Sequence, residues 1–434
     1  MAFSMMLYGA EGMGNDSYWM TTLAQSENDY EFGYRIAMDS NNNVYIIGNI
    51  QPPSGNFDAF MAKYDSAGTI QWQQTLSGGE ATDEFVRDIA IDSNNNLYVT
   101  GFTRIDAGTS WLLIYKYNSE GVIQWQQTLG NGIFGDTGTA ITIDSSDNVY
   151  VCGRFVNYFQ LVKYDSAGIV QWQIQTSDYA LGEAVTTDSS GNVYAFGTND
   201  SYDIMLVKYD SAGNFQWEKG LDSNGINEPA EITTDSNDNI YMTGYLYGAL
   251  LIMKFNTEGV IQWQRTLSGA EDDTSYTIAI DSSDNVYVGG SSRSVFNAGA
   301  GSSYLRNSII VKYNSSGEIQ WQRSLSGEYT DQIRGVAIDS RNNVYVTGDT
   351  SGTSSSTVIR ADIFLAKLPN DGSLTGTYSL GDISYTYAET FLETGTPALV
   401  TTVGTAVFGP AALPSQASNL TVANSELTGS FVKL

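Results

Sequence analysis

Acidic side chains recur as closely spaced pairs at four points along the sequence. Carboxylate oxygens gathered in one place are the ligands that Ca²⁺ and Mg²⁺ take in proteins, so such pairs predict a divalent metal site. A solvated acidic rim explains the same pattern without a metal. Two carboxylates are also the catalytic groups of a glycosidase, but nothing in the sequence singles out one pair for that role. The pairs are Glu27 with Asp29, Glu80 with Asp83, Glu271 with Asp273, and Glu328 with Asp331.

Four longer polar segments form a second candidate site. They are residues 49–58, 102–111, 291–308 and 349–362, and they mix small polar residues with isolated aromatic and arginine side chains. This composition favours recognition of a glycan or a protein surface by stacking and hydrogen bonding. It is equally typical of loops that bind nothing. The candidate contact residues are Phe57, Arg104, Trp111, Arg293, Phe296, Tyr304, Arg306 and Arg360.

Several kinds of catalytic chemistry are excluded by composition. Histidine is absent from the 434 residues, which removes the Ser-His and Cys-His nucleophile pairs, His-ligated zinc and the usual general base near neutral pH. Cys152 is the single cysteine, so no intrachain disulfide can form. Its apolar setting, VYVCGR, indicates a small buried residue rather than a reactive thiol. We therefore expect no catalytic residue, no cofactor other than the metal considered above, and a non-enzymatic function.

The charge balance limits the partners. Acidic residues outnumber basic residues 48 to 20, which gives a formal net charge of −28. Such a chain is repelled by a nucleic-acid backbone and by an anionic bilayer. No stretch approaches the length of a membrane span, and the N-terminus lacks the basic flank and the apolar run of a signal peptide. We expect a soluble protein without a signal peptide, with neither a nucleic-acid partner nor a membrane insertion.

Three marks recur in a fixed order, and each occurs seven times. The first is a Trp within an apolar stretch: Trp19, Trp72, Trp125, Trp172, Trp217, Trp263 and Trp321. The second is a D-S-x-x-N-x-Y-x-x-G box that begins at Asp39, Asp92, Asp144, Asp188, Asp235, Asp281 and Asp339. The third is a Lys before an aromatic residue or Leu: Lys63, Lys116, Lys163, Lys208, Lys254, Lys312 and Lys367.

Each repeat predicts four short strands. In the second copy they are RDIAID, LYVTGF, WLLIYKY and VIQWQQTL, rich in Ile, Val, Tyr and Trp and separated by Asp, Asn, Ser and Gly. Seven units of four strands predict an all-β, seven-bladed β-propeller of four-stranded blades. If the strand before the box is innermost, the last blade lacks its outer strand, and residues 18–23 are left to supply it. We expect this 3+1 closure by the N-terminal strand.

The copies differ in length on one face only. The spacing from each Lys to the next Trp, and from each box Asp to its Gly, is nine residues throughout. From box Gly to Lys it is 15, 15, 10, 11, 10, 22 and 19 residues for blades one to seven. The long connections of blades six, seven, one and two are therefore neighbours, and they share a face with the acidic pairs. Function tends to lie on variable loops of a rigid scaffold, so we predict that this long-loop sector is the working surface.

The repeated residues have structural and functional interpretations. The DSNNN start of the box resembles a calcium loop, but it lacks the sixth-position Gly and the twelfth-position Glu, so Asx turns are expected instead. The tryptophans suit a sugar-stacking platform or packing between blades, and their outer-strand position favours packing. The lysines are expected to pair with acidic neighbours along strand edges.

Residues after the last repeat differ in character. No Lys or Arg occurs between Lys367 and Lys433, and none of the three marks is present. The predicted organisation is an N-terminal arm (1–17), the propeller (18–368), and a small β-rich C-terminal segment (369–434) that serves attachment or assembly. About 60 residues is marginal for an independent core, so docking on the propeller, oligomerisation or a partner would stabilise it.

The boxes IAIDSNNNLYVTGFT and KYDSAGTIQWQQTL resemble the SBBP-type β-propeller repeat found in bacterial surface proteins and in structural proteins of marine bacteriophages. The resemblance covers residues 18–368 and carries no catalytic residues. It implies a non-enzymatic virion structural protein, capsid- or tail-associated, assembled in the host cytoplasm. The expected partners are other virion proteins through the C-terminal segment, further copies of the chain in the particle, and a host-surface glycan or protein. A bacterial surface carbohydrate-binding or adhesive propeller is the alternative, and a polysaccharide-acting propeller enzyme is a third.

Overall fold

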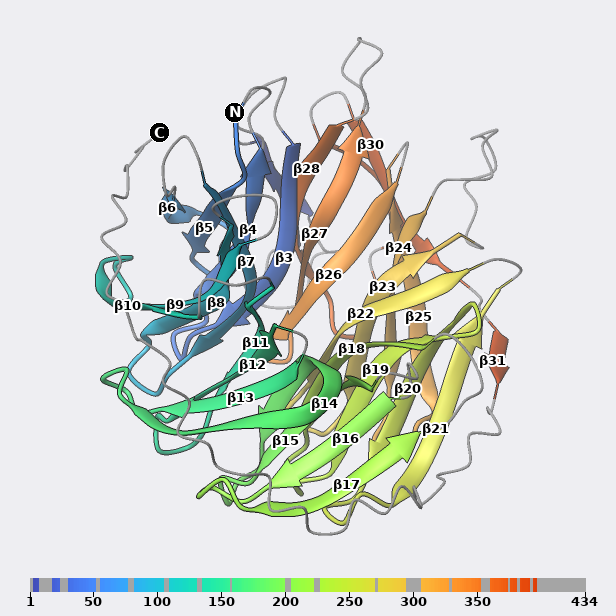
Figure 1. Cartoon of the computed structure of the whole chain (residues 1–434). Helices are drawn as coiled ribbons and strands as arrows, with labels where there is room; N and C mark the ends of the chain where they lie inside the picture. Colours follow the sequence, from blue (N-terminus) through green and yellow to red (C-terminus); the bar gives the residue numbers. More distant parts are fainter. Residues whose placement is uncertain are drawn as a thin grey trace.

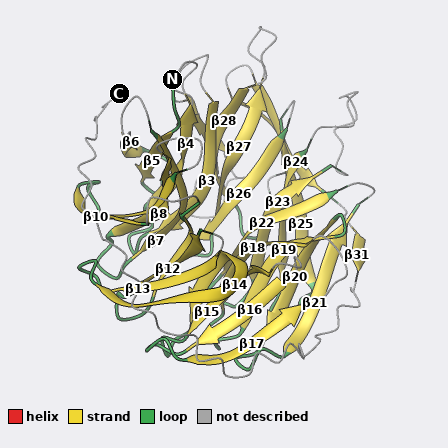
Figure 2. Ribbon diagram, in the orientation of Figure 1, coloured by secondary structure: helices red, strands yellow, loops and turns green. Residues whose placement is uncertain are grey.

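The computed structural model describes residues 3–7, 18–23, 30–51, 55–76, 82–104, 109–130, 135–156, 158–199, 204–221, 227–269, 272–293, 306–327, 330–352, 360–373, 375–380, 383–390 and 393–395. Throughout these ranges the secondary structure consists of strands and turns (Figure 2). No helix in them is long and apolar enough to cross a bilayer.

Within the described ranges the strands form seven antiparallel blades around a common axis (Figure 1), which confirms the predicted fold class. Blade one consists of β3 (Tyr30–Met38), β4 (Val44–Gln51), β5 (Asp58–Tyr64) and β6 (Ile70–Leu76), and blade two of β7 (Asp83–Ile91), β8 (Leu97–Arg104), β9 (Ser110–Tyr117) and β10 (Ile123–Leu129). Blade three consists of β11 (Thr137–Ile143), β12 (Val149–Phe155), β13 (Tyr158–Tyr164) and the first half of β14 (Val170–Thr187). Blade four consists of the second half of β14 with β15 (Val193–Asn199), β16 (Ile204–Tyr209) and β17 (Phe215–Leu221).

Blades five to seven complete the ring and carry extra outer strands. Their four-stranded parts are β18 (Asn227–Thr234), β19 (Ile240–Leu246), β20 (Ala249–Phe255) and β21 (Ile261–Ser268); β22 (Asp273–Ile280), β23 (Val286–Ser292), β24 (Asn307–Tyr313) and β25 (Ile319–Ser326); and β26 (Asp331–Ile338), β27 (Val344–Gly352), β28 (Arg360–Leu368) and β2 (Tyr18–Leu23). The additions are β31 (Glu393–Gly395) on blade five, β30 (Ile383–Glu389) and β29 (Gly376–Leu380) on blade six, and β1 (Phe3–Leu7) on blade seven.

The ring closes through the N-terminal strand, as predicted. β2 pairs antiparallel with β28 and places Trp19 opposite Lys367, the register that places Trp72 opposite Lys63 in blade one. The strand before each box is innermost, because β3, β7, β11, β14, β18, β22 and β26 contact one another in turn around the axis. The two turns of constant length therefore share one face, here called the short-turn face.

The box is a turn, which confirms the structural interpretation over the calcium loop. In blade one, Asp39 Oδ1 accepts the backbone N–H groups of Asn41 and Asn43 at 2.9 and 2.8 Å. Its Oδ2 accepts the Asn43 side-chain amide at 2.7 Å and the Tyr45 hydroxyl at 3.1 Å. Lys63 Nζ lies 3.9 Å from the same oxygen, so the expected pairing of the lysine with an acidic neighbour is present. The Asp carboxylate is therefore occupied by its own blade.

The tryptophans pack between blades, as the outer-strand position favours. Trp72 Nε1 donates to the carbonyl of Ser119 in blade two at 3.1 Å, and Lys63 Nζ donates to the same carbonyl at 2.9 Å. The indole lies against Gly121, whose φ of 79° is in the left-handed region that favours glycine. The same contact joins Trp19 to Gly68, Trp125 to Gly168, Trp172 to Gly213, Trp217 to Gly259, Trp263 to Gly317, and Trp321 to Gly372. The repeated hairpin thus joins each blade to the next around the ring.

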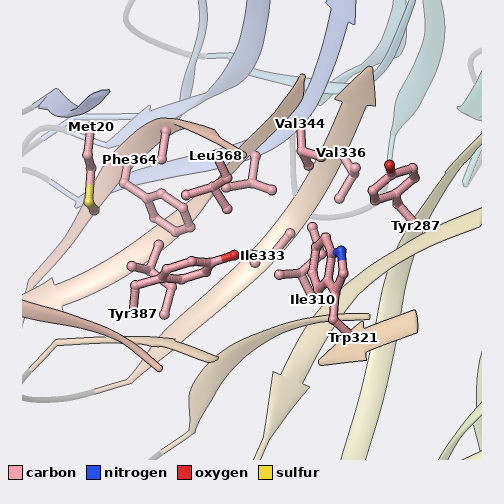
Figure 3. Close-up of a cluster of buried hydrophobic side chains, with 13 residues drawn as sticks. Met20, Tyr287, Ile310, Trp321, Ile333, Val336, Val344, Phe364, Leu368 and Tyr387 are labelled. Carbon is pink, nitrogen blue, oxygen red and sulfur yellow. The ribbon is translucent and has the colours of Figure 1, made fainter. Parts of the chain in front are cut away.

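The described part of the C-terminal segment docks on the propeller. β30 pairs with the outer strand of blade six, placing Ala388 opposite Ser324. Tyr387 of β30 is 2% exposed and joins the cluster of buried side chains that includes Met20 and Phe364 (Figure 3).

Cys152 of β12 is also buried, as expected, and burial raises the pKa of its thiol to about 12.

Candidate ligand-binding site

Every innermost strand carries a β-bulge at the same place. The pairing of β7 with β8 shifts register between Val86 and Asp88, so Arg87 is the extra residue, and the equivalent shift occurs in all seven blades. A bulge re-aims one side chain. Here the seven extra residues all line one central cavity, each five positions before a box Asp: Tyr34, Arg87, Thr139, Glu183, Ala230, Tyr276 and Arg334.

The repeated box glycine is what permits the bulge. Gly101 of β8 lies opposite Val86, and a Cβ built on Gly101 would fall 1.9 Å from the carbonyl oxygen of Phe85. A Cβ built on the box glycine would fall 1.8–2.4 Å from a carbonyl oxygen of the bulged strand in all seven blades. A side chain there would force the strands apart, so the glycine indirectly positions the residue that faces the cavity.

The cavity has a volume of about 480 Å³, within the ~300–1,000 Å³ range of small-molecule sites. Its other lining residues come from the first halves of the inner strands and from the ends of the second strands, such as Phe102 and Arg154. The inner strands begin at the variable connections. The cavity therefore occupies the half of the central channel that lies on the side of the variable connections, opposite the short-turn face.

One wall alternates cations with aromatic rings. Around blades two, one, seven and six the bulge residues are Arg87, Tyr34, Arg334 and Tyr276. The Tyr34 ring lies between two guanidinium groups, with Arg87 Cζ at 5.5 Å and Arg334 Cζ at 5.7 Å from its centroid. Arg334 is also 5.4 Å from the Tyr276 centroid. Such cation–π contacts orient the guanidinium groups and the rings together.

The arginines of the cavity differ in the ion pairs and hydrogen bonds that their side chains form with the rest of the protein. Arg334 forms an ion pair with Asp349 of β27. Arg35 donates to the Arg334 carbonyl at 2.8 Å and lies 3.7 Å from Asp88. Arg87 contacts the faces of Tyr34, Phe85 and Phe102 but forms no ion pair or hydrogen bond with another side chain in the described ranges. Arg154 uses its Nε, which donates to the Gly135 carbonyl at 2.9 Å.

The opposite wall is acidic. Glu183 lines the cavity from β14, and Glu228 lines it from β18. Burial raises the pKa of Glu183 to about 7, although the positive charges of Arg87 and Arg154 act to lower it. No ion pair joins Glu183 to either arginine in the part of the chain that the structure describes. The cavity wall thus holds Glu183 within electrostatic range of Arg87 and Arg154 without a direct ion pair.

Beneath this level, carboxylates join neighbouring blades. Asp88 Oδ2 accepts the backbone N–H of Ile141 in blade three at 2.8 Å. Glu231 Oε2 accepts that of Ile278 in blade six at 2.9 Å. Burial raises the pKa of Asp88 to about 7. These carboxylates directly follow the bulge residues of their strands and line a second, smaller cavity of about 200 Å³.

The predicted contact residues of the long loops that the structure describes do not line the cavity. Phe57 packs on Phe85, with ring centroids 4.9 Å apart, and Phe85 in turn contacts Phe102 at 4.8 Å. Arg104 lies 5.2 Å from the Phe85 centroid and donates from its Nε to Asp83 at 2.9 Å. Phe57 and Arg104 therefore support the aromatic group beside Arg87 from outside.

The other loop residues remain separate. Trp111 is half-buried in β9, Arg293 is paired with Asp272 at 3.2 Å, and Arg306 donates to Ser291 Oγ at 3.2 Å. Phe296, Tyr304 and the side chain of Arg360 lie outside the described residues. Their part in recognition stays a prediction.

The predicted metal ligands are only partly described. Asp273 Oδ2 accepts the backbone N–H of Gly269, and Asp331 Oδ2 that of Gly327, each at 2.6 Å. Asp83 accepts the Phe57 N–H at 2.9 Å. The described residues contain no group of three potential ligands, and the glutamate partners Glu80, Glu271 and Glu328, with Glu27 and Asp29, lie outside them. The three aspartates anchor loops, and metal binding stays a prediction.

The variable connection lengths do not point to the cavity residues, which lie in strands of constant spacing. The sequence signal that identifies them is variation in residue type at a position whose distance from the box Asp is constant. When the copies are aligned on the box Asp, the fifth position before it holds two arginines, two tyrosines, Thr, Glu and Ala. No structural role shared by all blades requires such different residues.

Comparison with known proteins supports the propeller repeat. The β-propeller repeat model SBBP matches residues 71–105, 262–297 and 321–354, each running from a Trp strand through the next box. The chain therefore contains SBBP-type β-propeller repeats. No curated protein matches it.

Solved structures with some likeness to the chain include proteins of different kinds. A protein of unknown function from Bacteroides caccae is 12% identical, with 68% of this chain and 93% of that one covered and a TM-score of 0.39. The gluconolactonase XC5397 from Xanthomonas campestris is 9% identical, with 80% and 99% covered and a TM-score of 0.40. A putative 6-phosphogluconolactonase from Bacteroides uniformis is 11% identical, with 79% and 98% covered and a TM-score of 0.46. At these values the likenesses carry no argument about function.

Proposed function

We propose that the protein is a non-enzymatic binding propeller that recognises its ligand in the central cavity. The observation that carries the proposal is the set of seven bulge positions. The scaffold repeats its turn and interblade contacts from blade to blade, yet these positions present five different residue types to one cavity. A ligand bound there meets a unique chemical environment, which the short-turn face does not offer.

The expected setting is a bacteriophage particle on which the propeller is displayed. The resemblance of the repeats to those of virion structural proteins supports this setting. The strands that β29, β30 and β31 add to blades five and six support an attachment role for the C-terminal segment, through which other virion proteins or further copies would dock. The host-side ligand would be a surface glycan or protein. Detection of the chain in purified particles by mass spectrometry tests the setting, and its detection only on bacterial surfaces would favour the adhesive alternative.

A blocking substitution tests the cavity. Ala230→Trp places a large side chain at a bulge position whose own side chain is smallest, so it should abolish binding to host-surface polysaccharide while leaving the melting temperature unchanged. The matched control is Ala167→Trp, in an exposed turn of the short-turn face, which should bind normally. Retained binding by the folded Ala230→Trp variant would contradict the proposal.

A polysaccharide-acting enzyme is the second candidate, and one observation favours it. Glu183 has a pKa raised to about 7 within the same cavity, as a general acid requires. Release of reducing ends from host polysaccharide, lost in Glu183→Gln, would establish this activity. Binding without turnover supports the non-enzymatic function.

A further inference from the structure

The charges around the cavity fall into two groups. Arg334 and Arg35 are neutralised locally, the first by its ion pair with Asp349 and the second by Asp88 at 3.7 Å. The exceptions among the described residues are Arg87, which has cation–π contacts but no hydrogen bond or ion pair, and Arg154, whose Nε donates to the Gly135 carbonyl. A guanidinium carries five N–H donors, so most donors of these two groups face the cavity with no acceptor in the described protein.

Two half-buried cations with open donors are unusual in a chain of net charge −28. Desolvating a cation without a partner is unfavourable, and a nearby carboxylate would normally close the pair. Glu183 is near enough to feel the charge of both Arg87 and Arg154, yet it pairs with neither. The remaining donors of Arg87 and Arg154, both of which line the cavity, are therefore open to an anionic ligand.

The rest of the wall indicates what else the ligand carries. Thr137, Thr139, Glu183 and Glu228 present hydroxyl and carboxylate oxygens that accept hydrogen bonds from ligand hydroxyl groups. Tyr276 supplies aromatic surface of the kind on which apolar ring faces stack. Among the described lining residues, uncommitted positive charge is limited to two arginines, and two glutamates oppose it. A single negative charge is therefore favoured over a dianion such as phosphate. A planar carboxylate also matches the guanidinium fork.

We propose that the cavity binds a carboxylated sugar, a uronic acid residue of a surface polysaccharide, with its carboxylate on Arg87 and Arg154 and its hydroxyl groups toward Glu183. This assignment rests on the proposed binding function and specifies its ligand class. It places the discrimination between acidic and neutral glycans in two side chains from neighbouring blades.

Calorimetric titration of the full chain tests the proposal with three probes: a polygalacturonate oligosaccharide, its carboxyl-reduced neutral counterpart, and a sulfated neutral oligosaccharide. The wild type should bind the uronate at least about tenfold more tightly than either other probe, as expected for loss of a charge-assisted bidentate contact. Arg87→Gln should remove this preference, and Arg87→Lys should restore part of it. The matched control is Arg341→Gln, an exposed arginine of a short-turn-face box with the same change in charge.

The outcomes separate the two proposals. Equal affinity of the wild type for charged and neutral probes, or an unchanged preference in folded Arg87→Gln, overturns the uronate assignment. If Ala230→Trp still abolishes binding in that case, the cavity function stands with another ligand. If uronate binding persists in Ala230→Trp, the site lies elsewhere and both proposals fall. Tighter binding of the sulfated probe assigns the arginines to sulfate and overturns the carboxylate.

Discussion

The short-turn face and the cavity wall are built from the same repeats but use them differently. On the short-turn face each box Asp has the same partners in every copy, as where Asp39 accepts hydrogen bonds from Asn43 and Tyr45 and where Asp144 accepts them from Asn148 and Tyr150. On the cavity wall the backbone repeats and the side chains differ. In this repeated fold the residues that stabilise the blades are therefore distinct from those that line the cavity, and the bulge positions supply the latter.

The largest expected effect on stability comes from removing the most buried of the tryptophans that pack between blades. Trp19 is 1% exposed and closes the ring against Gly68, whereas Trp125 is half-buried at an interior interface. We predict that Trp19→Ala lowers the free energy of unfolding by about 3–5 kcal/mol and Trp125→Ala by roughly half as much, because less surface is buried. Chemical denaturation of both variants measures the difference. Equal losses would mean that closure is no more buried than any other interface.

The glycine that allows the bulge should be nearly as important. Gly101→Ala should lower the free energy of unfolding by about 1–3 kcal/mol, because its Cβ would overlap the Phe85 carbonyl at 1.9 Å. Gly220→Ala is the matched control, since a Cβ there meets nothing within 4 Å. A stable Gly101→Ala variant would show that the bulge does not depend on the glycine.

Buried carboxylates with raised pKa values give stability a particular pH dependence. Burial raises the pKa of Asp331 to about 7, above its value in the unfolded chain, so the native state binds more protons than the unfolded state between about pH 4 and pH 7. Its contribution is therefore most favourable near pH 4 and is lost as the pH rises to about 7. Relative to Asp331→Asn, the wild type should lose about 1–3 kcal/mol over this range. A constant difference in denaturation midpoint would contradict the assignment.

The smallest expected effect concerns the acidic side of the cavity. Glu183 loses its charge as the pH falls through about 7, while a sugar carboxylate stays ionised, so uronate binding should strengthen about two- to fivefold between pH 8 and pH 6. Titrations at the two pH values measure this. Glu183→Gln should bind equally at both, and a pH effect that persists in this variant would assign the titration to another group.

The sequence was sufficient for the scaffold because its contacts repeat at fixed spacing. Trp72 and Gly121 recur with their neighbours in every copy, so the blade, the turn face and the closure by residues 18–23 could be predicted from local patterns. The pairing of β30 with β25 could not, because nothing in residues 383–389 marks which sheet edge they join. Arg87 was missed for another reason. A bulge changes the direction of a side chain without changing the length of the strand, so the alternation of apolar and polar residues does not reveal it.

The glycine opposite each bulge has an evolutionary consequence. Because the steric demand falls on Gly101 and its six equivalents in the second strands, the residue at the bulge itself is free to change. Arg, Tyr, Thr, Glu and Ala already occupy equivalent positions in one molecule without altering the surrounding pairing. A lineage can thus exchange one ligand for another by point substitutions at seven sites, with side-chain coupling where bulge residues of neighbouring blades touch, as Arg87, Tyr34 and Arg334 do. The constant backbone makes these seven positions a natural set for randomisation in binder engineering.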